Sequence, residues 1–135
     1  MALTAGRNTV EIQDGKTLIL PVKANTKIYE GSLVAVDSTG YAVPGKKVEG
    51  LLVAGRAEEF VDNTGVGNGN GVKSVRVTRG VFKLNNDVTN PITATDLLKD
   101  CYILDDETVT MLTVGTSVAG KVLRLDNGEV VVEIF

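Results

Sequence analysis

The chain lacks several side chains on which common chemistries depend. Its 135 residues include no histidine, no tryptophan and a single cysteine. Without histidine there is no histidine-based catalytic triad, no imidazole metal ligand and no ordinary proton shuttle near neutral pH. One cysteine, Cys101, excludes an intrachain disulfide and a cysteine-rich metal site. Because Cys101 begins an apolar segment and has no histidine to activate it, we expect a buried, structural thiol.

Other features that the sequence lacks limit its partners. No apolar run approaches the eighteen residues of a membrane-spanning helix, and the N-terminus has no basic start followed by an apolar run. The net charge is −3 with no long basic run, which argues against non-specific nucleic-acid binding. With no tryptophan and only three tyrosines, the chain offers few aromatic platforms for a sugar. We therefore expect a soluble, mildly acidic protein that is made inside the cell.

What the sequence does contain is β-forming aliphatic side chains. Hydrophobic residues make up 43% of the chain and aromatic residues only 4%, so the core must consist of Val, Leu and Ile. Hydrophobic segments recur about every ten residues and end in turn-forming residues, as in the final Asp126-Asn-Gly128 hairpin. The pattern predicts an all-β, single-domain fold, a small β-barrel or a jelly-roll-like sandwich. One short helix is predicted at residues 91–100, capped by Thr93 or Thr95 and packed through Leu97 and Leu98.

The segment 72–84 is predicted to be a long strand that crosses the middle of the domain. Val75 and Val77 alternate with polar residues, the alternation breaks at Arg79-Gly80, and it resumes with Phe82 and Leu84. An extra residue at a glycine predicts a β-bulge. The preceding residues 63–71 carry four glycines and predict a mobile loop. This loop opens a strand instead of a helix and lacks the Gly-Lys-Ser/Thr ending of a phosphate-binding loop, so it is not predicted to bind phosphate.

The first 22 residues are predicted to form an N-terminal arm with an edge hairpin, and residues 23–135 the β-domain. Residues 9–13 alternate, Asp14-Gly15 is typical of a tight turn, and residues 17–22 form an apolar run. Because Pro21 cannot donate to a ladder, that run is an edge strand or leaves the sheet there.

Two groups of residues are candidates for contact with a partner. The apolar run supplies one group and the only local basic concentration supplies the other; the members are Leu18, Ile19, Leu20, Arg76, Arg79 and Lys83. The basic residues either dock a negatively charged surface or form the solvated face of their strand. No catalytic, cofactor-binding or metal-binding constellation is predicted: the acids at 58–59 and 105–107 suit a strand and a turn.

The order of motifs resembles that of small cement, or decoration, proteins on the heads of tailed bacteriophages, especially Mu-like phages and prophages. The resemblance covers residues 23–135 and rests on residues 26–44, 53–63, 74–82, 101–109 and 117–134. It implies a β-barrel or jelly-roll-like virion protein, made in the bacterial cytoplasm, that assembles on the outside of the mature capsid. There it would clamp neighbouring major capsid protein subunits without catalysis or a cofactor. We also expect self-association, as a dimer or a trimer, because closed symmetric oligomers are the common way to present such arms. Residues 1–22 have no counterpart in the resemblance.

Competing functions remain open at this point. One is another phage structural role, in the tail, the baseplate or a head fibre. A second, of a different class, is a ligand- or carbohydrate-binding β-barrel, and a third is an enzyme. The expected role for the arm is to add a strand, within residues 9–20, to an exposed sheet edge on the shell.

Overall fold

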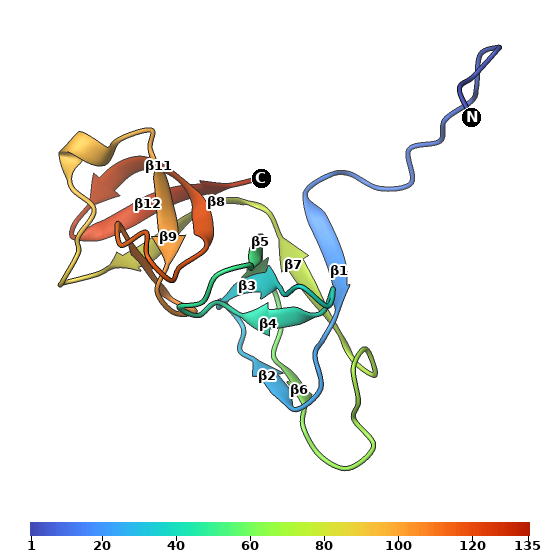
Figure 1. Ribbon diagram of the computed structural model, residues 1–135, viewed down its shortest axis with the longest axis horizontal. Coiled ribbons are helices and arrows are strands. Elements are labelled where there is room, and N and C mark those ends of the chain that lie inside the picture. Colours follow the sequence, from blue (N-terminus) through green and yellow to red (C-terminus); the bar gives the residue numbers. More distant parts are fainter.

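The computed structural model describes residues 1–135, and its regular secondary structure is almost entirely β (Figure 1). The all-β fold with a closed barrel is therefore confirmed. No helix in it has the length and apolar character to cross a bilayer. The strands are β1 Thr17–Pro21, β2 Thr26–Ile28, β3 Leu33–Val36, β4 Ala42–Pro44, β5 Leu52–Ala57, β6 Val61–Asn63, β7 Ser74–Thr78, β8 Gly80–Asn86, β9 Asp100–Ile103, β10 Thr108–Thr110, β11 Val118–Asp126 and β12 Glu129–Ile134.

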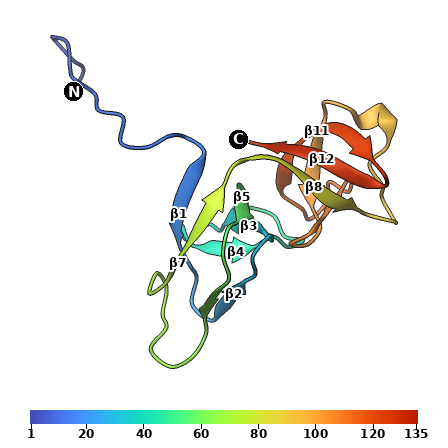
Figure 2. The same cartoon turned by 180° about the vertical axis from the view of Figure 1, so that it is seen from behind.

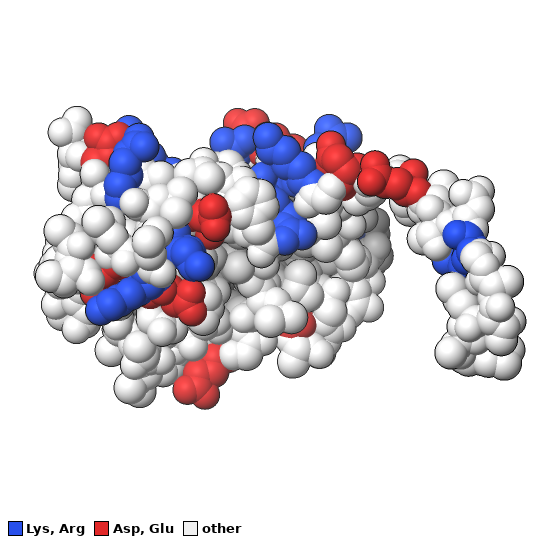
Figure 3. Space-filling view, turned by 90° about the horizontal axis from the view of Figure 1, so that it is seen from above, with Lys and Arg blue, Asp and Glu red and all other residues white.

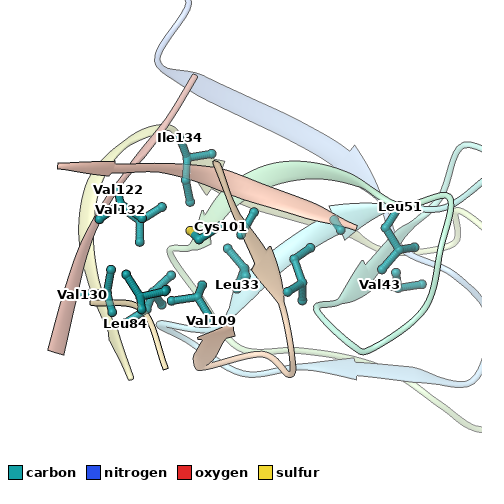
Figure 4. Close-up of a cluster of buried hydrophobic side chains, with 14 residues drawn as sticks. Leu33, Val43, Leu51, Leu84, Cys101, Val109, Val122, Val130, Val132 and Ile134 are labelled. Carbon is teal, nitrogen blue, oxygen red and sulfur yellow. The ribbon is translucent and has the colours of Figure 1, made fainter. Parts of the chain in front are cut away.

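The C-terminal half closes into a five-stranded barrel in the order β10-β8-β12-β11-β9. Its central hairpin, β11–β12, turns at Asn127 and Gly128, whose φ angles of 51° and 83° are those that an Asn-Gly turn requires. Aliphatic side chains from all five strands fill the interior, together with residues of β3 and β4 (Figure 4). This barrel core has fourteen buried residues and includes Leu33, Ile103, Val109 and Val130.

The N-terminal half is an open sheet in the order β1-β7-β5-β3-β4, with the short β2–β6 pair packed beside it. A second core of nine buried residues lies between them, formed among others by Ile28, Val34, Val75 and Val77. β5 is the central strand of this sheet, since β7 and β3 flank it. Figures 1 and 2 show this half and the barrel side by side, joined by the continuous path of β7 and β8.

The predicted bulge at Arg79-Gly80 is wrong. The β1–β7 and β8–β12 ladders run without a register shift, and the Arg79 N–H extends the first ladder by donating to the Lys16 carbonyl at 2.8 Å. Val77 belongs to the second core, whereas Phe82 and Leu84 belong to the barrel core. The alternation changes phase because the chain passes from one core to another, and the two cores lie on opposite faces of the same path.

The predicted helix reduces to a single 3₁₀ turn, Ala94–Asp96, with Thr93 at its N-cap. The Thr93 N–H donates to the Asp96 carboxylate at 2.9 Å. The expected packing of Leu97 and Leu98 is wrong, because these side chains are 45% and 68% exposed. The Leu98 N–H instead donates to the Val122 carbonyl, which turns the chain into β9 after one turn.

The predicted N-terminal hairpin does not form. Residues 1–16 contain no strand, and β1 pairs with β7 over all five of its residues. Asp14 Oδ1 accepts hydrogen bonds from the N–H groups of Lys16 and Thr17, a local turn that directs the preceding chain away from β1. The strand at residues 17–21 pairs with β7 because Leu18 and Leu20 then pack against the second core. The free arm, residues 1–16, therefore ends six residues earlier than the predicted boundary at 22.

Candidate partner-binding surface

The N-terminal arm is the most exposed apolar segment of the molecule. Every residue from 1 to 16 is exposed, and the arm projects away from the body (Figure 1). The Leu3, Val10 and Ile12 side chains are 70%, 68% and 87% exposed. Val10 and Ile12 are two residues apart and so share one face whenever the arm is extended. Leaving aliphatic side chains in water is unfavourable, so this segment is suited to burial against another surface.

The three apolar candidates from β1 divide between the core and the surface. Leu18 and Leu20 are partly buried and pack against the second core, so the chain itself already uses them. Ile19 points the other way, is 66% exposed and lies directly opposite Arg76 on β7. The expected strand addition by residues 9–20 is thereby limited to the part of the arm before Thr17.

The outer edge of β1 is also largely blocked. The Thr17 N–H donates to Asp14 Oδ1 at 3.2 Å and its carbonyl accepts from Gln13 Nε2 at 3.0 Å. Pro21 has no N–H to offer. Only the backbone groups of Ile19 remain open between these two residues, which makes β1 a poor acceptor for a partner strand.

The three basic candidates differ in their surroundings. Lys83 forms an ion pair with Asp126 at 3.0 Å and thereby holds the pKa of that carboxyl below its ordinary value. The guanidinium groups of Arg76 on β7 and Arg79 between β7 and β8 form no ion pair within 4.0 Å, although the Arg76 backbone N–H donates to Glu59 Oε1 at 3.2 Å. On the face of the body in Figure 3, basic and acidic side chains are mixed and neither sign dominates. Arg76 and Arg79 are thus unpaired at ion-pair distance, although the charge of Arg76 contributes to lowering the pKa of Glu58.

Arg56 was not predicted as a site residue, yet it lies opposite Thr78 in the β5–β7 ladder, between the two predicted basic residues on and after β7 and the barrel residue Phe82. Its guanidinium lies 4.7 Å from the centre of the Phe82 ring, a cation–π distance, and it donates to Glu58 Oε1 through Nε and Nη2 at 3.0 and 2.7 Å. The hydrogen bond from Arg56 is the main cause that lowers the pKa of Glu58. The sequence carries no signal for this contact, because Arg56 and Phe82 belong to strands of different sheets.

Two shallow pockets adjoin each other where the two halves meet. The first, about 110 Å³, is apolar inside and has Arg56 and Lys83 at its rim; its other lining residues are Gly31, Leu33, Phe82, Leu84 and Ile134. The second, about 290 Å³, is acidic and is lined by Tyr29, Glu30, Gly31, Ser32, Asp106 and Glu107. Gly31 lines both, so the two pockets adjoin there; we call the pair the groove, with a basic and apolar part and an acidic part.

The remaining chemical candidates are structural in this fold. Cys101 is fully buried, as predicted, and burial raises the pKa of its thiol to about 12. Asp105 accepts the Glu107 N–H at 2.9 Å within its turn. No three acidic or cysteine side chains lie together as a metal site.

Comparisons with known proteins add no relative. No protein-family model, no curated protein and no solved structure matches this chain.

Proposed function

We propose that this protein is a non-catalytic structural component of a tailed-phage particle. It binds the outer surface of the mature capsid and holds neighbouring major capsid protein subunits together. The proposal rests on the resemblance of residues 23–135 to phage cement proteins. The single structural observation that supports it is the exposed arm, which carries apolar side chains and has no partner in its own chain.

The physical basis of such a role is binding energy alone. A protein that binds the assembled shell and not its dissociated subunits stabilises the shell by mass action. Many symmetry-related copies then add up to a large effect, even when each contact is modest. The arm provides the contact by adding a strand to a sheet edge on a neighbouring subunit of the particle, and its main-chain hydrogen bonds provide most of the affinity.

The body suits a clamp better than a receptor for small molecules. Side chains from all five strands lie in the barrel interior, and of the surface pockets one, about 110 Å³, is below the range of roughly 300–1,000 Å³ for ligand sites and the other, about 290 Å³, is at its lower limit. A role in the tail, the baseplate or a head fibre uses the same arm and differs only in its location on the particle. A dimer or trimer would present several arms at once, as closed symmetric oligomers commonly do.

Deletion of residues 1–12 tests the proposal. This deletion leaves the caps that Gln13 and Asp14 provide to Thr17, so the body should keep its melting temperature. We expect binding to expanded capsids, measured by co-sedimentation, to fall at least tenfold. A matched control replaces Lys121, an exposed barrel residue remote in sequence from the arm, by Ala and should bind normally. Undiminished binding by the deletion variant would contradict the proposed role of the arm.

A further inference from the structure

One strand of the barrel keeps an open edge beside the groove. β8 pairs with β12 over residues 80–85, but on its other side it pairs with β10 only through Asn85 and Asn86. The Asn85 N–H donates to the Glu107 carbonyl on this second side. Because alternate residues of a strand direct their backbone groups to the same side, Val81 and Lys83 direct theirs there too, where no strand pairs with them. The edge between residues 80 and 84 can therefore accept a strand.

The groove provides side-chain sites along this open edge. Phe82 and Leu84 face the apolar pocket, whereas Val81 and Lys83 are on the outer side, 48% and 51% exposed. The acidic pocket lies towards the C-terminal end of the edge, because Glu107 is bonded to Asn85 there. A strand that binds here antiparallel to β8 meets acidic residues at its own N-terminal end and the apolar, basic-rimmed pocket further along.

The arm has the complementary order of side chains. From its N-terminal end the arm carries the basic Arg7, then the aliphatic Val10 and Ile12 on either side of the acidic Glu11, and finally the acidic Asp14. With Glu11 opposite Lys83, Ile12 falls opposite Phe82 and Val10 opposite Leu84. Before Val10 the arm must leave β8, because Asn85 and Asn86 already pair with Glu107 and β10, and Arg7 is then directed towards the acidic pocket that Glu107 lines.

We propose that the arm of one copy of this protein binds antiparallel to the open edge of β8 in a second copy. The Glu11–Lys83 and Gln13–Val81 pairs exchange backbone hydrogen bonds, and the aliphatic residues of the arm cover the apolar pocket. Lys83 can turn towards Glu11 because Arg124 also lies near Asp126, at 3.8 Å, and remains as its partner. The inference builds on the proposed intermolecular role of the arm, but it requires no capsid.

The arm is directed towards a second copy by its own attachment. If β1 continued straight, residues 9–15 would run alongside β8 of the same chain, because Lys16 is paired with Arg79 just before β8 begins. The turn at Asp14 and the side-chain bond from Gln13 to Thr17 instead direct the arm away from the barrel (Figures 1 and 2). The arm thus projects away from its own chain, while the edge of β8 beside its attachment stays open. Exchange of such a segment between identical chains is a common route to dimers.

Cross-linking between two single-cysteine variants tests the register. Purified Glu11→Cys and Lys83→Cys proteins are mixed under mild oxidation, so that any heterodimeric disulfide is intermolecular. Directly opposite residues in a hydrogen-bonded antiparallel pair have Cα atoms about 5.5 Å apart, which suits a disulfide. The native Cys101 does not compete because it is fully buried. We expect a disulfide-linked heterodimer, and much less of it in the control mixture of Glu11→Cys with Lys121→Cys.

The double variant Glu11→Cys/Lys83→Cys then distinguishes binding of the arm to β8 of a second copy from binding to β8 of its own chain. Linked dimers and longer chains support the proposal. A monomer with an internal disulfide would overturn it, since the arm would then bind its own β8, and so would equal cross-linking in the control mixture.

Charge exchange provides a second, independent readout. Glu11→Lys and Lys83→Glu should each weaken self-association at least tenfold in light scattering, and the combined variant should restore it. Unchanged association in both single variants would overturn the inference. If capsid binding persists while self-association and cross-linking are absent, this inference fails and the proposed function stands. If copies associate but do not bind capsids, the proposed function fails instead.

Discussion

Replacing Asn63 by Ala should destabilise the N-terminal half measurably. Asn63 is fully buried at the end of β6, and its Nδ2 donates to the carbonyls of Val22, Lys23 and Gly69 at 3.2, 3.0 and 3.0 Å. One amide group thus ties the end of β1 to the glycine-rich loop. In alanine all three contacts are lost, and the loop keeps fewer bonds to the body.

The magnitude follows from the amide's two hydrogens. They make the equivalent of two hydrogen bonds, each worth about 1 kcal/mol net. Val22 keeps a donor, because the Gly71 N–H also reaches its carbonyl at 2.9 Å, and the unpaired Asn63 Oδ1 is removed together with the amide. The expected loss is therefore about 2 kcal/mol, which lowers the melting temperature of a domain of this size by about 6–10 °C.

Urea unfolding followed by far-ultraviolet circular dichroism measures this loss without a tryptophan. The matched control is Asn70→Ala in the same loop, where an exposed side chain accepts the Ala24 N–H at 2.8 Å and water can replace it. That variant should lose about 0.5 kcal/mol or less. If the two variants lose the same amount, the loop is not held by Asn63 and the reasoning is refuted.

Three further results follow from the same structure. Gly120→Ala should cost about 3 kcal/mol in urea unfolding, because its Cβ would lie 2.4 Å from the Glu133 carbonyl oxygen, whereas Gly69→Ala, with open space around it, should be near neutral. The Asp87 carboxylate accepts hydrogen bonds from the Thr89 N–H and other donors, which lower its pKa in the folded protein. The stability that Asp87 contributes is therefore fully present above its unfolded-state pKa of about 4 and is lost as the pH falls through the lower folded-state pKa. Asp87→Asn should remove that part of the pH dependence of unfolding. Cys101, with its pKa raised to about 12, should not react with a thiol reagent at pH 8 until urea unfolds the protein, and rapid native-state reaction would contradict its burial.

Sequence periodicity predicted the β class because each strand shows its own alternation. The Asn127-Gly128 turn was predictable for the same reason, since a two-residue turn with positive φ angles is encoded by its own residues. The error at Arg79-Gly80 has a different origin. Alternation shows that one face of a strand is buried, but not against which core, so a strand shared between two cores looks like a bulged strand in one.

Long-range contacts explain the other differences. Asn63 bonds to carbonyls 40 and 41 residues away, so nothing near the glycine-rich loop indicated that one of its residues is fixed. The alternating residues 9–13 predicted a strand, and this prediction is wrong, because the chain offers them no partner strand. The groove of Arg56 and Phe82 joins segments from separate sheets and was likewise invisible.

The most direct test of the proposed phage role is the copy number of this protein in tailed-phage particles purified from the cells that make it. Quantitative mass spectrometry against the major capsid protein gives that ratio. A shell-covering cement role predicts a copy number comparable to that of the major capsid protein. A few copies per particle would place the protein in the tail or at a vertex, and its absence from the particle would contradict the proposed function outright.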